Sequence, residues 1–198
     1  QNFASWYSQV PGLKVVAPYS ASDAKGLLKS AIRDPDPVLF LEHKHLYRQT
    51  YNKNPYPGEN YTLPFARSVV KRPGSDVSIL TWGALVQRSL LAAEQAKSNG
   101  INVMVVDLRT IAPYDWPGIV TAVTSTNRVI VAHEDQLTCG FGAELSARIA
   151  DELFEHLDAP VKRVGALDCP VAYSPILEEA ILPQSSDILK AIQSVTAY

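Results

Sequence analysis

The feature that most constrains the fold is a regular alternation of continuous apolar runs and helix-like segments between residues 77 and 195. Continuous apolar runs are typical of parallel strands that helices cover on both faces, whereas half-exposed strands alternate apolar and polar residues. The expected strands are 77–82, 102–108, 128–132 and 161–166, and the expected helices are 84–99, 115–125, 142–157 and 186–195. This pattern predicts a doubly wound α/β sheet.

A shorter strand, helix and strand unit is expected before this sheet, with strands at 13–17 and 38–48 and a helix at 21–32. Ser20 and Asp23 form a capping pattern at the start of that helix, and the Asp-Pro-Asp-Pro at 34–37 ends it. Residues 49–64 hold three prolines, a glycine and polar residues without periodicity, which is typical of a linker. We therefore predict three parts, residues 1–48, 49–64 and 65–198.

Charge and composition exclude several classes of partner. The formal net charge is −2 and the Lys and Arg residues are scattered, so no basic stripe favours nucleic acid. No apolar stretch is long enough to span a membrane and no export signal is visible, so we expect no membrane association. Neither Cys139 nor Cys169 lies in a Cys-x-x-Cys spacing, which predicts two reduced, mostly buried thiols.

Polar residues follow several of the predicted strands. Loops at the carboxyl ends of parallel strands gather on one edge of the sheet, where ligands usually bind. The residues expected there are Trp82, Gly83, Asp107, Arg109, His133, Glu134, Asp135 and Asp168. General acid or base catalysis would need one of these carboxylates beside His133 in a dry pocket.

The segment "HEDQLTCGFGAEL" at 133–145 is open to three interpretations. Cys139 could be a nucleophile, but no partner stands at a motif spacing. The Gly140-Phe141-Gly142 run could hold a phosphate, but it lacks the third glycine of the dinucleotide fingerprint. We favour a tight strand-to-helix turn with Glu144 in the first helical turn.

Two further groups could bind a cation. His43 and His45 would point to the same face of a strand and could be a metal pair, but without a third ligand we favour a solvated or interface face. In "AIRDPDP" the two prolines leave carbonyl oxygens at a helix end without backbone donors. Such oxygens can coordinate a hard cation.

Four segments resemble, in order and spacing, the beta subunit of the thiamine-diphosphate-dependent decarboxylase of 2-oxo acid dehydrogenase complexes. They are "FASWYSQVPGLKVVAPYSASDAKGLLKSAIRDPDPVLFLEHKHLYR", "LPFARSVVKRPGSDVSILTWGALV", "VVDLRTIAPYDW" and "HEDQLTCGFGAEL". Within the family, "LEHKHLYR", "TWGALV" and "AHEDQLTCGFGAE" are more similar to the branched-chain 2-oxo acid type than to the pyruvate type, and the pyruvate or acetoin type is the alternative. The resemblance implies a transketolase-type C-terminal domain preceded by the last strand, helix and strand of a pyrimidine-binding domain.

The resemblance also implies a cofactor and partners. Thiamine diphosphate and Mg would bind between an alpha and a beta subunit, in an assembly with a second beta subunit. The acyl product would pass to the lipoyl acyltransferase component. The active-site histidine and glutamate of the family lie upstream of Gln1, so we assign no catalytic or cofactor-binding residue and expect the isolated chain to be inactive. Its compartment would be the cytoplasm in a bacterium or the mitochondrial matrix in a eukaryote.

Two sites and two rival functions complete the expectations. The resemblance implies a potassium site on backbone oxygens of Ala31, Asp34 and Asp36. It also implies docking of the acyltransferase through Asp158 and the terminal carboxylate of Tyr198, although Asp158 could instead cap the turn before Pro160. A rival of another class is a non-catalytic dimerisation and docking module. A second rival, a free-standing nucleotide-binding protein, is disfavoured by the missing glycine.

Overall fold

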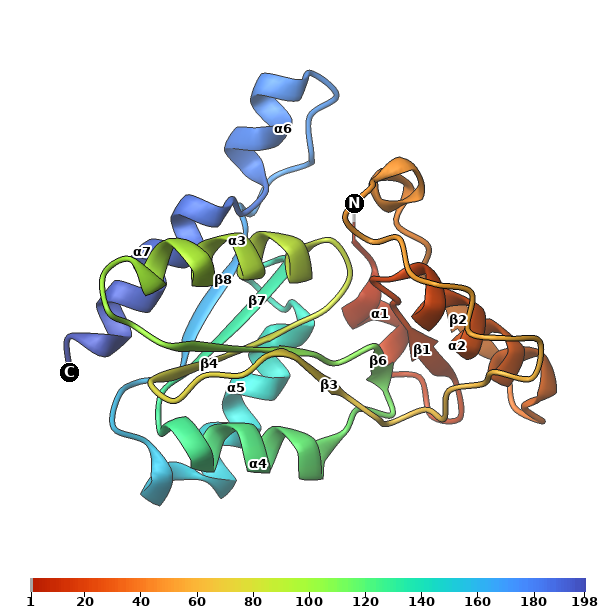
Figure 1. The fold of residues 1–198 in the computed structure, drawn as a ribbon, viewed down its shortest axis with the longest axis horizontal. Helices are drawn as coiled ribbons and strands as arrows, with labels where there is room; N and C mark the ends of the chain where they lie inside the picture. The colour runs from red at the N-terminus through yellow and green to blue at the C-terminus, as the bar shows by residue number, and fades with distance from the viewer. Residues whose placement is uncertain (1) are drawn as a thin grey trace.

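In the computed structural model, which describes residues 2–198, helices cover both faces of a five-stranded sheet (Figure 1). The strand order is β3-β5-β4-β7-β8, and only β3 runs antiparallel to its neighbour. The strands are β3 (Val69–Arg72), β4 (Val77–Thr81), β5 (Val103–Asp107), β7 (Val129–Gln136) and β8 (Lys162–Ala166). Gln1 lies outside the described residues.

Successive side chains along the central strands point into two different cores. Ile79 and Ile130 face the core that contains residues of α3 (Leu85–Lys97) and α7 (Ser185–Thr196). Leu80 and Val131 face the opposite core, with α4 (Trp116–Thr126) and α5 (Phe141–Glu152). All four side chains are fully buried, which explains why the strands are continuously apolar. The predicted doubly wound α/β architecture is therefore confirmed.

A second sheet, with the order β2-β1-β6, joins the two parts of the chain. Strand β1 (Lys14–Val16) pairs parallel with β2 (Val38–Phe40) and antiparallel with β6 (Thr110–Ala112). Strand β6 comes from the C-terminal part, and α1 (Ala4–Ser8) also packs against α5 of that part. The N-terminal unit therefore depends on the C-terminal part for a strand and for part of its core.

Helix α2 (Ala21–Arg33) begins where its capping pattern predicts. The Ser20 side chain accepts a hydrogen bond from the Asp23 amide and donates one to the Asp23 carboxylate. Leu27 is fully buried, but Leu28 and Ile32 are 45% and 76% exposed. Part of the expected apolar face of this helix is therefore uncovered among residues 2–198.

Three predicted boundaries were wrong. The strand expected at 38–48 ends at Phe40, because a 3-10 helix, η1 (Lys44–Arg48), turns Leu46 into the core. The helix expected at 142–157 ends at Glu152, and a 3-10 turn, η2 (Phe154–His156), follows. Strand β7 continues to Gln136, so the first residues of the expected loop at 133–145 belong to the strand, and after an irregularity beyond Ala132 the strand pairs with β8 again at Gln136.

Four elements have no counterpart among the expected ones. They are helix α1, strands β3 and β6, and helix α6 (Pro175–Ile181), which projects from the body of the molecule (Figure 1). Both strands are short, and β3 holds a Lys and an Arg at the edge of its sheet, so neither has the apolar run of a buried strand.

Candidate functional site

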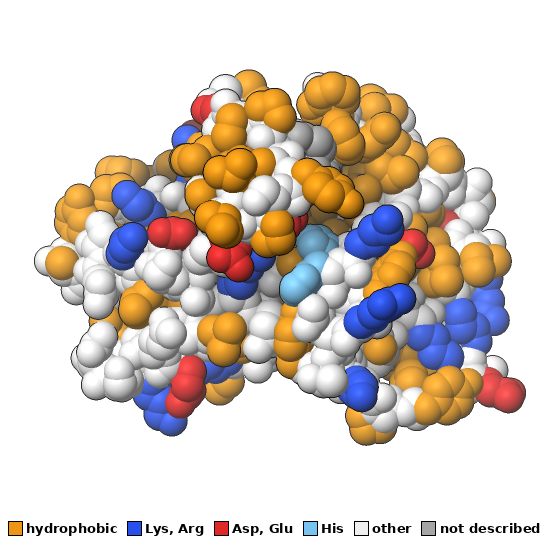
Figure 2. Space-filling view, turned by 90° about the horizontal axis from the view of Figure 1, so that it is seen from above, with side chains coloured by type: hydrophobic (Ala, Val, Ile, Leu, Met, Phe, Trp, Pro, Cys, Tyr) orange, Lys and Arg blue, Asp and Glu red, His pale blue; other side chains and the backbone are white. Residues whose placement is uncertain are grey.

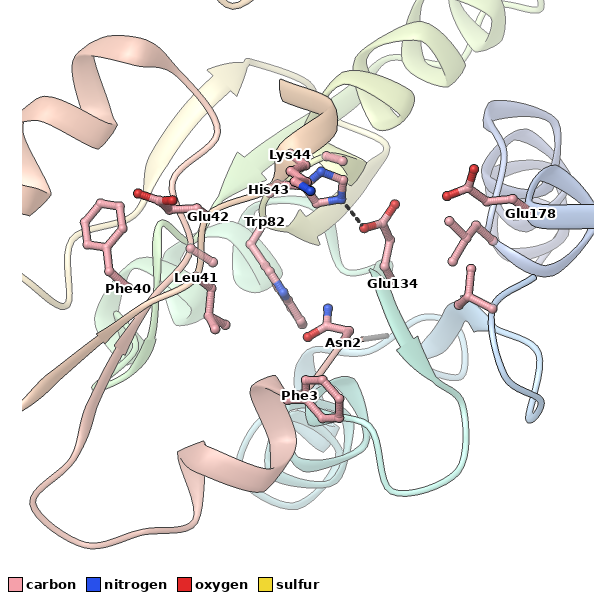
Figure 3. Close-up of a pocket in the computed structure, with 15 residues that line it drawn as sticks. Asn2, Phe3, Phe40, Leu41, Glu42, His43, Lys44, Trp82, Glu134 and Glu178 are labelled. Atoms are coloured by element: carbon pink, nitrogen blue, oxygen red, sulfur yellow. Dashed lines mark hydrogen bonds and ion pairs between the residues drawn. The ribbon is translucent and has the colours of Figure 1, made fainter. Parts of the chain in front are cut away.

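A cleft of about 540 Å³ lies where the N-terminal unit meets the carboxyl edge of the five-stranded sheet. Its walls come from the chain after β4, from β7, from the β2–η1 connection and from α6. Figure 3 shows His43 and Glu134 pointing toward each other and joined by a hydrogen bond, with Trp82 and Glu178 on other parts of the cleft wall. Figure 2 shows the hollow from above, flanked by hydrophobic side chains and with histidine at its rim.

Glu134 is the central charge of the cleft. Its Oε2 lies 2.7 Å from His43 Nε2, which donates because a carboxylate only accepts. Its Oε1 accepts from Arg88 Nη1 at 3.3 Å, and Arg88 also donates to the carbonyl of Pro183. Burial would raise the pKa of Glu134, but the hydrogen bond from His43 and the positive charge of Arg88 hold this pKa below its ordinary value.

This arrangement fits a structural clamp better than a general base. An ionised carboxylate with a lowered pKa and two fixed donors has little affinity for a proton at neutral pH. The two donors come from η1's N-cap residue and from α3, while Glu134 belongs to β7. The clamp therefore ties the N-terminal unit to two elements of the C-terminal domain.

His133 is a core residue and not a catalytic base. Its ring is completely buried against Trp82, and Nδ1 lies 3.1 Å from the carbonyl oxygen of Asp135. Burial lowers the pKa of His133 to about 4, so the imidazole is neutral near neutral pH. A Cβ added at Gly142 would lie 2.2 Å from this ring. The glycine therefore admits the histidine beneath α5 and does not cradle a phosphate.

The remaining residues of the 133–145 segment organise the turn into α5. Asp135 is buried and accepts a hydrogen bond from the Phe141 amide at 3.2 Å, and burial raises the pKa of Asp135. Cys139 has a φ of +57° and is exposed, and Cys169 is half-buried, so the expectation of mostly buried thiols was wrong. The backbone amide and the hydroxyl of Thr138 both donate hydrogen bonds to the Asp168 carboxylate. These bonds attach the turn to the segment that follows β8.

A buried charge cluster lies beside the cleft, between α2 and the C-terminal domain. Asp23 of α2 pairs with Lys71 of β3 at 2.9 Å and with Arg109 at 2.8 Å. Asp107, at the end of β5, is completely buried and lies 3.7 Å from the same Lys71 nitrogen. The cluster therefore joins the two parts of the chain by charge, as β1 and β6 join them by backbone hydrogen bonds.

The proposed histidine pair does not share a strand face. His45 lies within η1, and its ring is edge-on to that of His43 at a centroid distance of 6.2 Å. His43 Nε2 is committed to Glu134. No group of three His, Cys, Asp or Glu side chains within residues 2–198 could hold a metal ion. The prediction of a solvated or interface face is consistent with the exposed His45 and the interdomain contact of His43.

The segment of the potassium prediction closes α2. The Asp34 amide donates to the Ala31 carbonyl, and Asp34 and Asp36 both pair with Lys14, at 2.6 and 3.0 Å. The hydrogen bond from Lys14 holds the pKa of Asp34 below its ordinary value. These carboxylates already have a cationic partner, so only backbone oxygens would be left for an ion, and the site stays a prediction.

The two docking residues lie on the surface. The Asp158 side chain is 53% exposed and lies 3.5 Å from Arg128, and its backbone amide donates to the carbonyl of Asn127. It accepts no capping hydrogen bond from the described backbone, which disfavours a role limited to the turn before Pro160. Tyr198 is also exposed. Docking at these residues stays a prediction.

The described residues do not fit thiamine diphosphate. A diphosphate and its metal ion need cationic or amide donors and oxygen ligands, but no group of three possible ligands occurs in the described chain. The cleft carries Glu42, Glu134 and Glu178 on its walls beside His43 and Lys44, so its lining is not the concentrated set of cationic or amide donors that a diphosphate needs. No step of catalysis is therefore assigned to this chain. No helix within the described range is long and apolar enough to cross a membrane.

Fold and junction together define a class of protein, a doubly wound α/β domain that completes the last part of a second domain. Residues 66–188 match the family described as the C-terminal domain of transketolase, and residues 1–50 match the transketolase pyrimidine binding domain. The chain belongs to the transketolase C-terminal domain family. The two matches lie on either side of the predicted linker, while the boundaries at 48 and 64 stay predictions.

Comparison with known proteins gives relatives of one kind. The chain is 38% identical over 195 residues to the pyruvate dehydrogenase E1 component subunit beta of Rhizobium meliloti. This match covers 98% of the present chain and 42% of the relative. The chain is 44% identical to the mitochondrial subunit beta-1 of Arabidopsis thaliana, over 96% of this chain and 53% of that protein. It is 41% identical to the pyruvate dehydrogenase E1 component subunit beta of Rickettsia conorii, over 100% of this chain and 60% of that protein.

These relatives are longer than the chain, which spans about half of their length. A solved structure described as a split-gene transketolase in an inactive beta4 tetramer has a TM-score of 0.80 and 24% identity. The matched region covers 98% of the present chain and 61% of the transketolase chain. At this identity the likeness shows the fold alone.

The most informative contacts of the junction were missed at the level of sequence. Neither Lys71 nor Arg88 was predicted as a site residue, because their partners are distant in sequence. Lys71 pairs with Asp23, 48 positions away, and Arg88 pairs with Glu134, 46 positions away. The Glu134 side chain was noted among the strand-end residues, but its partner His43 was placed on a strand. A lone lysine on a short edge strand carries no periodic signal that would have identified it.

Proposed function

We propose that this chain is the C-terminal portion of the beta subunit of a thiamine-diphosphate-dependent 2-oxo acid dehydrogenase that acts on pyruvate. The supporting observation is the set of relatives, 38% to 44% identical over nearly the whole chain, that are named as pyruvate dehydrogenase beta subunits. Sequence motifs favoured the branched-chain type, with the pyruvate type as the alternative. The names of the relatives support the alternative, and we adopt it.

The contribution of these residues is assembly and not chemistry. The Glu134 clamp, the Asp23 cluster and the shared sheet all join the pyrimidine-domain segment to the C-terminal domain. Thiamine diphosphate and Mg would be held by an alpha subunit and by other parts of the beta subunit. The proposed partners are an alpha subunit, a second beta subunit and the lipoyl acyltransferase component. The proposed compartment is the cytoplasm in a bacterium or the mitochondrial matrix in a eukaryote.

A pair of chimeras tests this function. The matching C-terminal part of the Rickettsia conorii pyruvate dehydrogenase beta subunit is replaced by these 198 residues, and the same exchange is made in a branched-chain beta subunit. We expect the pyruvate chimera to assemble with its alpha subunit and to decarboxylate pyruvate. We expect the branched-chain chimera to assemble poorly.

Assembly and activity of the branched-chain chimera alone would show that the pyruvate assignment is wrong. Failure of both chimeras to bind an alpha subunit would favour the rival hypothesis, a non-catalytic dimerisation and docking module. The isolated 198-residue chain serves as the control and is expected to be inactive, because its described residues offer no site for the cofactor. Decarboxylation by the isolated chain would contradict this division of roles.

A further inference from the structure

Asp107 is a completely buried carboxylate with one unused oxygen. Its Oδ1 accepts a hydrogen bond from the backbone amide of Arg109 at 3.1 Å. Its Oδ2 has no hydrogen-bond partner among the described residues, and the nearest cation, Lys71 Nζ, lies 3.7 Å away. An unpaired oxygen on a buried carboxylate is costly when the group is ionised, so the site favours the neutral acid.

Lys71 lies between two carboxylates that belong to different parts of the chain. Its Nζ donates to Asp23 Oδ2 at 2.9 Å and lies 3.7 Å from Asp107 Oδ2. Asp23 is part of α2 in the N-terminal unit, whereas Lys71 and Asp107 are on β3 and β5 of the C-terminal domain. The hydrogen bond from Lys71 to Asp23 therefore crosses the junction, and Asp107 competes for the same ammonium group.

Arg109 completes the connection from the C-terminal side. Its Nη2 lies 2.8 Å from Asp23 Oδ1, and its amide binds Asp107. The residue has a φ of +60°, a left-handed conformation that is unfavourable for a side chain other than glycine. Such strain persists only where surrounding contacts hold it, and here the contacts are with the two carboxylates and with the backbone amide of Ala17, which donates to the Arg109 carbonyl at 2.8 Å.

We propose that Asp107 is a proton-dependent latch between the two parts of the chain. With Asp107 neutral, Lys71 and Arg109 are both free to hold Asp23, and α2 is attached firmly to the C-terminal domain. Loss of the proton turns Asp107 into a second anion that draws Lys71 away from Asp23, and the attachment of α2 weakens.

The charges that face Asp107 are consistent with titration near neutral pH. Lys71, Asp23 and Arg109 approach it from β3, α2 and the turn after β5, and Tyr19 precedes α2. Burial raises the pKa of Asp107 to about 7, with Lys71 and Arg109 opposing the rise and Asp23 adding to it. Burial also raises the pKa of Tyr19 to about 12, so this phenol stays neutral throughout the range.

Amide hydrogen exchange of the full 198-residue chain tests the latch. Protection factors of α2, each corrected for the intrinsic exchange rate, are measured at about pH 5.5 and 8.5 in the wild type and in Asp107→Asn. We expect protection in the wild type to fall about tenfold at the higher pH, the size expected for one charge-assisted hydrogen bond. In Asp107→Asn, which cannot ionise, protection should not fall at the higher pH.

The exposed carboxylate Asp168 provides the control, since Asp168→Asn should keep the pH dependence of the wild type. A carbon NMR titration of the Asp107 carboxyl group in the wild type needs no variant and should show a midpoint near neutral pH. The proposal is overturned if α2 protection in the wild type is independent of pH, if Asp107→Asn keeps the same dependence, or if the carboxyl group is ionised throughout.

Discussion

The imidazole of His133 lies almost parallel to the indole of Trp82, with ring centroids 5.5 Å apart and an interplanar angle of 11°. This contact buries a histidine whose pKa falls to about 4, in the same domain as Asp107, whose pKa rises to about 7. Burial is the main cause of both shifts, because it favours the neutral form of each group. The neutral form of histidine lacks a proton, whereas the neutral form of aspartic acid keeps one. The two groups therefore have opposite effects on how stability changes with pH.

Asp107→Asn should expose the contribution of His133. Below pH 6.5 the unfolded chain protonates His133 and the folded chain does not, so stability is lost as pH falls toward 4. Asp107 acts the other way, because the folded chain keeps a proton between pH 3.8 and about 7 that the unfolded chain releases. Without Asp107, the free energy of unfolding should rise by about 1.4 kcal/mol per pH unit between about pH 5 and 6.5. Identical pH profiles of wild type and variant in denaturant titrations would contradict this expectation.

Gly142→Ala should destabilise the chain by about 1 to 3 kcal/mol, the usual range for overpacking. The added Cβ would lie 2.2 Å from both Cδ2 and Nε2 of the buried His133. Chemical denaturation of Gly142→Ala, His133→Ala and the double variant gives the coupling between the two positions. We expect the double variant to be more stable than the sum of the single effects predicts. Strict additivity would mean that the glycine has another role.

Glu134→Gln should loosen η1 from the C-terminal domain. The neutral amide cannot replace the charge that binds His43 and Arg88, so we expect the free energy of unfolding to fall by about 1 to 3 kcal/mol. Thermal unfolding and amide exchange of residues 44–48 measure the effect. The control is Glu155→Gln, which alters a side chain that is 85% exposed and should change neither quantity. Equal behaviour of the two variants would rule out the clamp.

Potassium should stabilise the assembled enzyme through the end of α2. We expect potassium chloride to raise the thermal midpoint more than the same concentration of tetramethylammonium chloride, because only the small ion can be held by backbone oxygens at Ala31, Asp34 and Asp36. Asp36→Asn should preserve the effect, since the expected ligand there is a carbonyl. No difference between the two salts would remove the potassium prediction.

Asp158→Asn should weaken docking of the acyltransferase component without abolishing it. An exposed ion pair contributes about 0.2 to 1 kcal/mol, so we expect a fall in affinity of less than about sixfold, and a smaller salt dependence. A chain extended beyond Tyr198 should show a similar loss. The matched control is Asp151→Asn, an exposed carboxylate on α5. Binding that is equally strong in all four proteins at each salt concentration would exclude this surface.

The large elements were predictable because their signals are local. Strand residues such as Ile79 and Leu80 are buried on opposite faces, which produces the continuous apolar run, and Ser20 caps α2 at the expected residue. The short strands β3 and β6 carry no such run, since each is stabilised by one neighbour far away in sequence. Their existence depends on tertiary pairing that no local pattern records.

The junction was predicted least well, for a related reason. Asp107 and Glu134 were both placed at the carboxyl edge of the sheet, where the structure has them. Their partners could not be predicted, because Lys71 and His43 reach them only when the two parts of the chain pack together. Polar side chains at strand ends were therefore expected to face a ligand, whereas the structure pairs Glu134 with His43 and Arg88 and seals Asp107 beside Lys71.

The pairing of β1 with β6 sets a limit on how such chains can be recombined. Composition suggests a cut within residues 49–64, but such a cut would separate β1 from the strand that completes its sheet and would leave β6 as an open edge on the other fragment. Exchange between homologous genes at that point would pair a β1 and a β6 from different parents. An exchange that keeps this pairing intact therefore has to move β1 together with the whole C-terminal domain.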